Sequence, residues 1–200
     1  MPDAPQSWPE IQAWRRERRA ALLEARQKLA RAEHQRASAA IVAQLDVLLE
    51  KHAVRRIGIY WPIRREIDLR PLALRLVAAG GEAALPVILA KNQPLEFRPW
   101  TADAKMASGI WDIPYPVSGA AVVPQALLVP LVGYDDACFR LGYGGGYYDR
   151  TIPTLTPKPL AIGLGFAFGR LASIYPQPFD QPMDLIVTEA GITSRAKPPP

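Results

Sequence analysis

The chain has 200 residues, with 24 Lys and Arg against 19 Asp and Glu, and a single cysteine. One thiol excludes an intramolecular disulfide and a cysteine metal cluster, which favours a reducing compartment. Residues 1–10 lack the apolar segment of a secretory signal, and no apolar run approaches the roughly 20 residues that span a bilayer. We expect a cytoplasmic monomer without membrane contact, with one domain over residues 1–200 and its core at about 10–190.

Positive charge is concentrated in the first third of the chain. Residues 1–70 hold 14 Lys and Arg against 9 Asp and Glu, whereas residues 71–200 hold 10 of each. Such a field can attract nucleic acid or a small anion such as a nucleotide, and it can also be an ordinary solvated helix face.

Hydrophobic periodicity predicts two helices at the start, over residues 8–29 and 32–50. Ser7 can cap the first helix, with Pro9 in its first turn. The rest of the chain reads as a helix over 69–79, a proline-rich loop over 110–116, and strands over 56–61, 83–89, 95–100, 127–132, 160–166 and 185–188. The final residues, 195–200, are predicted to be disordered.

Strands alternate with helices in the middle of the chain, and several of these strands are apolar throughout. This pattern predicts an α/β fold: a mostly parallel central sheet with helices on both faces, preceded by the N-terminal helices. Ligands of such sheets bind beyond the carboxyl ends of the strands.

The segment 140–150, Arg-Leu-Gly-Tyr-Gly-Gly-Gly-Tyr-Tyr-Asp-Arg, follows an apolar strand and predicts a phosphate-binding loop. Glycine lets a ligand approach the backbone, successive N–H groups can converge on an anion, and Tyr147 could open a helix. Arg140 offers a planar fork for phosphate, and Asp149 a carboxylate that Mg²⁺ could bridge to it. The segment matches neither the P-loop nor G-x-G-x-x-G, so a tight turn between strand and helix is the alternative.

Together with Val-Pro-Leu-Val-Gly-Tyr-Asp at 129–135, this segment closely resembles the signature of the 5-formyltetrahydrofolate cyclo-ligases, or 5,10-methenyltetrahydrofolate synthetases. Three supporting segments follow the same family in order: 60–68, Trp-Asp-Ile-Pro-Tyr-Pro at 111–116, and the acidic stretch 180–189. The resemblance covers roughly residues 10–190.

The resemblance implies ATP- and Mg²⁺-dependent cyclisation of 5-formyltetrahydrofolate, with or without a polyglutamate tail, to 5,10-methenyltetrahydrofolate, ADP and phosphate. The γ-phosphoryl group would be transferred to the formyl oxygen, and N10 would then displace phosphate. The protein's task would be positioning and charge neutralisation.

The resemblance also implies roles for single residues. Arg140 and Tyr148 are the implied catalytic residues, and Asp149 and Asp180 the implied metal ligands, with Asp184 a weaker candidate. The implied ATP site comprises Arg15, Arg19, Arg140, Leu141, Gly142, Tyr143, Gly144, Gly145, Gly146, Tyr147 and Tyr148. The implied folate site comprises Trp61, Glu66, Trp111, Tyr143, Gly144, Gly145, Gly146 and Tyr147.

Simpler explanations exist for several of these residues. Trp111 could be a core aromatic, Glu66 part of a solvated charged run, and Asp180 and Asp184 surface caps.

The chain departs from the family pattern at three positions. Cys138 stands where glycine is usual, and would strain a turn that needs positive φ by about 1 kcal/mol. Arg15 replaces a usual lysine, and Phe179 replaces a common histidine.

Two other functions are compatible with parts of the sequence. A nucleic-acid-binding protein could use the basic N-terminal helix, but the positive charge ends near residue 70, far from the most distinctive motif. A protein that binds another phosphorylated metabolite could use the same loop, but it would leave the Trp111 segment without a purpose.

Overall fold

Two helices open the chain in the computed structural model, which describes residues 5 and 7–195. They are α1 (Trp8–Lys28) and α2 (Arg31–Lys51), each close to its predicted limits. The Ser7 N–H donates to the Glu10 carboxylate at 2.9 Å, and Pro9 lies in the first turn, so the start of α1 is satisfied as expected. The predicted disorder of the C-terminal tail concerns residues that, apart from Arg195, lie outside the described ones.

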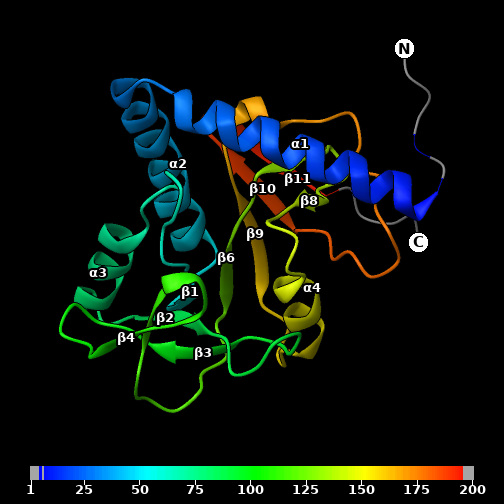
Figure 1. Ribbon diagram of the computed structural model, residues 1–200. Helices are drawn as coiled ribbons and strands as arrows, with labels where there is room; N and C mark the ends of the chain where they lie inside the picture. Colours follow the sequence, from blue (N-terminus) through cyan, green and yellow to red (C-terminus); the bar gives the residue numbers. More distant parts are fainter. Residues whose placement is uncertain (1–4, 6, 196–200) are drawn as a thin grey trace, which may run out of the picture.

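A seven-stranded sheet forms the centre of the molecule, in the order β11-β10-β9-β6-β1-β2-β3 (Figure 1). Neighbours from β2 to β10 pair in parallel, while the edge strands β3 and β11 run antiparallel. The strands are β1 (Arg56–Gly58), β2 (Glu82–Val87), β3 (Glu96–Pro99), β6 (Ala126–Pro130), β9 (Leu160–Leu164), β10 (Leu185–Thr188) and β11 (Gly191–Ser194).

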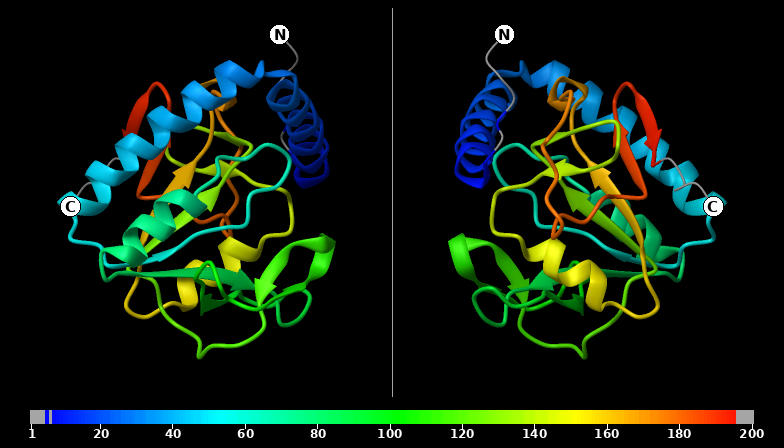
Figure 2. Two further views of the ribbon diagram at one scale, coloured as in Figure 1. Left: turned by 90° about the vertical axis from the view of Figure 1, so that its left-hand side faces the viewer. Right: turned by 90° about the vertical axis from the view of Figure 1, so that its right-hand side faces the viewer.

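Helices cover both faces of the sheet, as predicted (Figure 2). On one face, α2 and α3 (Arg70–Ala78) pack Ile41, Leu45 and Leu72 against strand residues such as Ile57 and Leu128. The other face is covered by α4 (Tyr147–Thr151), the turn Ile152–Thr154 and long loops. The predicted class, an α/β fold with a mostly parallel sheet, is confirmed.

The strand order places a topological switch between β1 and β6. From β1 the chain proceeds outward through β2 to β3, then crosses to β6 and continues outward on the other side to β11. The residues that follow β1 and β6 therefore emerge side by side at one edge of the sheet, where α/β proteins bind ligands.

Some small elements differ from the prediction. The segment 110–116 is not only a loop: it holds the turn Ile110–Asp112 and β5 (Pro114–Pro116), which pairs with β4 (Met106–Ser108). β11 was not predicted, nor was the small pair β7 (Gly133–Tyr134) and β8 (Arg140–Leu141). The helix expected after the glycines exists as α4 but is only five residues long.

Cys138 occupies the tight turn before the glycine-rich segment, with φ of 64°. Its N–H donates to Asp135 O at 3.0 Å, and its fully buried thiol packs in the core beside β6 and β10. The strain anticipated for this cysteine is thus present in the backbone. Burial raises the pKa of the thiol to about 11, so it stays protonated at neutral pH.

We expect Cys138→Val to lower the free energy of unfolding by roughly 2 kcal/mol, because a β-branched residue is poorly tolerated at this positive φ. Cys138→Gly should stay within about 1 kcal/mol of the parent, since relief of strain offsets the lost packing of the thiol. Urea unfolding would measure both free-energy changes, provided that the slope of the unfolding free energy against urea concentration is the same in the variants and the parent. Equal stability of the two variants would contradict the assigned strain.

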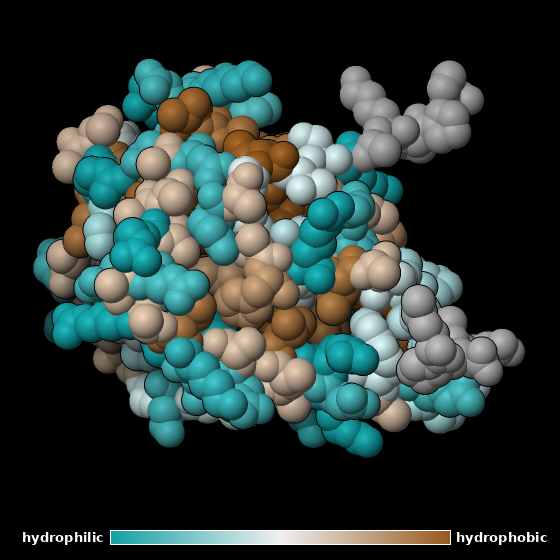
Figure 3. Space-filling model, turned by 90° about the horizontal axis from the view of Figure 1, so that it is seen from above, coloured by the Kyte–Doolittle hydropathy of each residue, from teal (hydrophilic) through white to brown (hydrophobic). Residues whose placement is uncertain are grey.

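The surface seen from above intersperses hydrophilic and apolar residues rather than gathering the apolar ones into a broad face (Figure 3). Within residues 5 and 7–195, none of the helices combines the length and apolar character needed to cross a membrane.

Candidate active site

A cleft of about 1710 Å³ lies at the carboxyl ends of β1, β2 and β6. Its walls come from α1, the loops that follow β1 and β2, the segment 109–115, and residues 140–150. In Figure 2, α1 and the β4–β5 hairpin project on the same side of the molecule with the glycine-rich segment between them. Apart from the weaker metal candidate Asp184, every residue given a role from the sequence lines this cleft: Arg15, Arg19, Trp61, Glu66, Trp111, Arg140, Leu141, Gly142, Tyr143, Gly144, Gly145, Gly146, Tyr147, Tyr148, Asp149 and Asp180.

Arginine side chains hold the glycine loop, residues 142–146, by donating hydrogen bonds to its carbonyl groups. Arg19 Nε donates to Gly142 O at 2.6 Å, and an Arg150 terminal nitrogen donates to Gly145 O at 2.7 Å. Gly144 and Gly146 have φ of 93° and 64°, values that side chains rarely allow. Among the described residues, none accepts a hydrogen bond from the N–H groups of 142–146. These consecutive donors remain available to an anion.

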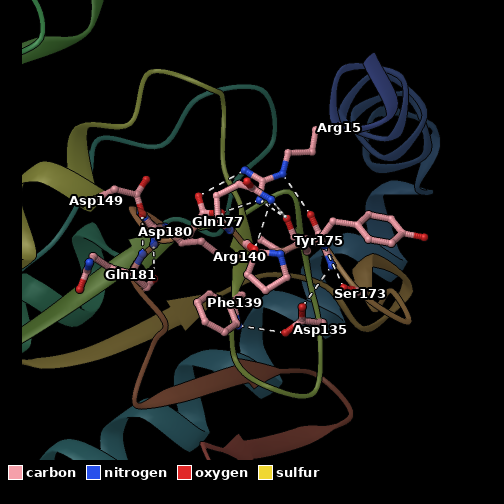
Figure 4. A network of polar contacts seen from close by, with 12 residues as sticks. Arg15, Asp135, Phe139, Arg140, Asp149, Ser173, Tyr175, Gln177, Asp180 and Gln181 are labelled. Atoms are coloured by element: carbon pink, nitrogen blue, oxygen red, sulfur yellow. Dashed lines mark hydrogen bonds and ion pairs between the residues drawn. The ribbon is translucent and has the colours of Figure 1, made fainter. Parts of the chain in front are cut away.

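Arg15 and Arg19 come from one face of α1 but have different surroundings. The Arg15 guanidinium pairs with Asp180 at 2.5 Å and donates to Ile174 O at 3.0 Å and Tyr175 O at 2.9 Å (Figure 4). Arg15 therefore fastens α1 to the segment before Asp180. Arg19 lies against the glycine loop, where burial and the neighbouring Arg15 charge lower its pKa.

The predicted metal ligands are both engaged in ion pairs. Asp149 Oδ1 forms an ion pair with an Arg140 terminal nitrogen at 3.0 Å and accepts a hydrogen bond from the Gln181 N–H at 3.0 Å, while its Oδ2 has no partner among the described residues. Asp180 is held by Arg15 and also accepts from the Gln177 N–H at 2.7 Å. In the described part of the chain, no group of three or more His, Cys, Asp or Glu side chains could hold a metal ion.

Asp184, the weaker metal candidate, lies outside the cleft. Its Oδ2 accepts the Ala161 N–H at 2.8 Å near the start of β9. It is a strand cap, as its simpler explanation predicted.

The implied catalytic residues Arg140 and Tyr148 are neighbours. The Arg140 guanidinium carbon lies 5.9 Å from the centre of the Tyr148 ring, and Arg140 also donates to Gln181 O at 2.8 Å. Within the described residues the Tyr148 hydroxyl makes no hydrogen bond. Burial, followed by the Glu66 charge, raises its pKa, so the phenol is neutral at pH 7 and can donate a hydrogen bond.

Glu66 lines the cleft and is only 6% exposed, so the solvated-charge explanation is wrong. Its two oxygens accept from the Tyr143 hydroxyl at 2.7 Å and from the Ile63 N–H at 2.8 Å. Burial raises the pKa of Glu66 above its ordinary value. Trp111 is 66% exposed at the rim, with its ring centre 6.1 Å from that of Tyr147, so it is not a core aromatic. Trp61 is half-buried nearby, with the Arg70 guanidinium 4.8 Å from its ring centre.

Sequence reasoning missed several residues of this region. Arg26 is 4% exposed and donates to the Tyr143 hydroxyl at 2.5 Å, and the buried Tyr60 hydroxyl faces the same cluster. A signal was present: Arg15, Arg19 and Arg26 share the helical face of Ile11 and Leu22, which marks them as inward-facing. Trp8 and Phe179 also line the cleft, with ring centres 5.5 Å apart.

Comparison with known proteins places this geometry in context. The sequence model of the 5-formyltetrahydrofolate cyclo-ligase family matches residues 11–189. The chain is 37% identical to a 5-formyltetrahydrofolate cyclo-ligase of Mycoplasma pneumoniae over 65 residues, an alignment that spans 32% of this chain and 39% of that relative. It is 28% identical to the enzyme of that name from Haemophilus influenzae, over 70% of this chain and 79% of that one. The solved structure of Aquifex aeolicus 5,10-methenyltetrahydrofolate synthetase superposes with a TM-score of 0.79 at 28% identity, covering 93% of this chain and 95% of that one.

Proposed function

We propose that this chain, which belongs to the 5-formyltetrahydrofolate cyclo-ligase family, converts 5-formyltetrahydrofolate to 5,10-methenyltetrahydrofolate at the expense of ATP. The observation that carries the proposal is the cleft itself. A loop of free N–H groups lined by arginines and a buried carboxylate flanked by aromatic rings meet in one cavity. The first suits a triphosphate and the second suits a flat ring that carries N–H donors.

The phosphates of ATP would bind the glycine loop, with Arg19 and Arg140 supplying positive charge. Arg140 offers a fork for phosphate oxygens, and Gly142 and Gly144 let those oxygens approach the backbone. The five-residue α4 is too short to contribute much of a helix dipole, so the N–H groups and arginines would supply most of the attraction. Arg15 would act indirectly in this scheme, because its contacts with Asp180 and the two carbonyl groups use most of its donors.

Asp149 is the best candidate to hold Mg²⁺, because its Oδ2 is unpaired among the described residues. The ion would be held by single carboxylates rather than by a preformed cage of protein ligands. Magnesium commonly binds one or two carboxylates together with substrate phosphates and water, so two separate carboxylates suffice. Asp180 would join it only by loosening its pair with Arg15. When bound, the ion would neutralise charge on the phosphates.

The folate would bind in the part of the cleft that Glu66 and the glycine loop line together. The Glu66 carboxylate has acceptor sites left after its two hydrogen bonds and could bind ring N–H groups of the pterin. Trp111 at the rim and Trp61 within offer faces for stacking.

The reaction must convert an amide oxygen into a leaving group. Transfer of the γ-phosphoryl group to the formyl oxygen forms an O–P bond and releases ADP. N10 then bonds to the formyl carbon and loses its proton, while the C–O bond breaks and phosphate departs with the former formyl oxygen. Arg140 and a hydrogen bond from Tyr148 would stabilise the charge that develops on the transferred group.

We further propose that the protein acts as a cytoplasmic monomer, independent of nucleic acid and membranes, on folates with or without a polyglutamate tail. Burial of the only cysteine fits a reducing compartment. The inward position of Arg15 and Arg26 on α1 removes part of the basic face on which a nucleic-acid function would depend.

The proposal is tested by mixing folded protein, Mg-ATP and 5-formyltetrahydrofolate and following the absorbance of the methenyl product. We expect one ADP per methenyl product formed. ADP formation without methenyl product would instead favour another phosphorylated metabolite. Salt-sensitive binding of nucleic acid without ATP turnover would favour the basic-helix alternative.

A further inference from the structure

A buried chain of hydrogen bonds connects α1, the glycine loop and the loop after β1. Arg26 donates to the Tyr143 hydroxyl at 2.5 Å, and that hydroxyl donates to Glu66 Oε1 at 2.7 Å. Arg26 and Glu66 are 4% and 6% exposed, and the Arg26 guanidinium carbon is 5.8 Å from the centre of the Tyr143 ring. Because a guanidinium can only donate, the direction of both hydrogen bonds is fixed.

The geometry around Glu66 favours an ionised carboxylate. Oε1 accepts an O–H and Oε2 accepts the Ile63 N–H, so both oxygens already serve as acceptors. Burial opposes the charge, whereas Arg26 and Arg64 favour it. Further titratable groups around Glu66 are Tyr60 and Tyr148 in the cleft, and His34 and Asp68, which line a small second cavity on the α2 side of Glu66.

Arg26 has no carboxylate partner of its own among the described residues, and its Nε is buried without a hydrogen bond. Burying a guanidinium without a carboxylate partner costs folding free energy, which indicates that Arg26 has a role other than stabilising the fold. Its positive charge acts on Glu66 through space, and its hydrogen bonding reaches Glu66 by way of the Tyr143 hydroxyl. Arg26 itself does not line the cleft and so does not contact a ligand there.

We propose that Arg26 is a positioning residue that, through Tyr143, keeps Glu66 ionised and oriented toward the folate end of the cleft. This inference rests on the proposed function, since it assumes that Glu66 receives the pterin. The same hydrogen bonds connect the glycine loop to Glu66, because Tyr143 belongs to that loop.

Arg26→Met tests the proposal, because it removes the charge and keeps an apolar stem. Without the cation the Glu66 carboxyl holds its proton to higher pH, so the acidic limb of kcat/KM for the folate should move upward by about one pH unit or more. We expect KM for the folate to rise at pH values below the shifted limb and to recover above it, with KM for ATP little changed. Tyr143→Phe, which keeps the ring, should shift the limb in the same direction, and Arg26→Lys should restore it in part.

The Glu66→Gln background supplies the control. There the limb assigned to Glu66 is absent, so adding Arg26→Met should produce no further pH shift. A uniform loss of kcat at every pH with an unmoved limb would show a merely structural Arg26 and overturn the proposal. If Arg26→Met does not fold, the same comparison with Tyr143→Phe decides. A wild-type protein that neither binds nor cyclises 5-formyltetrahydrofolate would instead refute the proposed function.

Discussion

Replacing Gly142 with valine is expected to lower turnover at least 100-fold while leaving the fold intact. A Cβ on Gly142 would meet no atom within 4 Å, and its φ is not in the left-handed region, so the Cβ itself adds neither a clash nor left-handed backbone strain. The new side chain would instead occupy open space beside the loop N–H groups, where it would displace the phosphates. A displacement of about 1 Å can cost a factor of 100 in rate. Turnover and thermal unfolding of the same sample measure both effects.

Gly142→Ala is the matched control and should give an intermediate loss. Gly145→Val would be less informative, since a Cβ there would lie 2.9 Å from the Tyr147 ring and disturb that side chain. Wild-type turnover in Gly142→Val would mean that the phosphates do not bind at this part of the loop.

Asp149→Asn should lower kcat on the order of 100-fold and raise the Mg²⁺ concentration needed for half-maximal activity. The amide preserves shape and can still accept from Gln181 through its oxygen, but it loses the charge that pairs with Arg140 and would bind the metal. Titration of activity with Mg²⁺ at saturating ATP separates the two effects.

Asp184→Asn provides the comparison, because it makes the same change at a carboxylate that does not line the cleft. Asp184 lies outside the cleft and its side chain only caps Ala161, a contact that an asparagine oxygen can keep. Its Mg²⁺ dependence should match that of the parent. A Mg²⁺ requirement that rises in Asp184→Asn but not in Asp149→Asn would reverse the assignment of the metal ligand.

The parts of the fold that could be predicted depend on local signals. The strand 185–188 was predicted with its observed limits. A short, mostly apolar run between polar segments is typical of a buried parallel strand. The glycine loop was recognisable because its flanking arginine, tyrosines and aspartate are unusual for a simple turn. The strain at Cys138 was inferred instead from the family resemblance, because this cysteine stands where glycine is usual, and its φ of 64° confirms it.

Features set by distant partners could not be predicted. β5 is bounded by prolines, and it becomes a strand only because β4, several residues earlier, pairs with it. The spacing of Arg26 on the basic helix marks it as inward-facing, but its contacts with Tyr143 and, through it, Glu66 join residues that are far away in the sequence. Likewise, the ion pair that holds Arg15 to Asp180 joins residues 165 positions apart.

The central claim is that one cleft brings the γ-phosphate of ATP to the formyl oxygen of the folate. The most direct measurement uses 5-formyltetrahydrofolate labelled with ¹⁸O in the formyl group and analyses the released phosphate by mass spectrometry. We predict one ¹⁸O atom in each phosphate formed along with the methenyl product. Phosphate without the label, released alongside the methenyl product, would contradict phosphorylation of the formyl oxygen and the arrangement of the site derived from it.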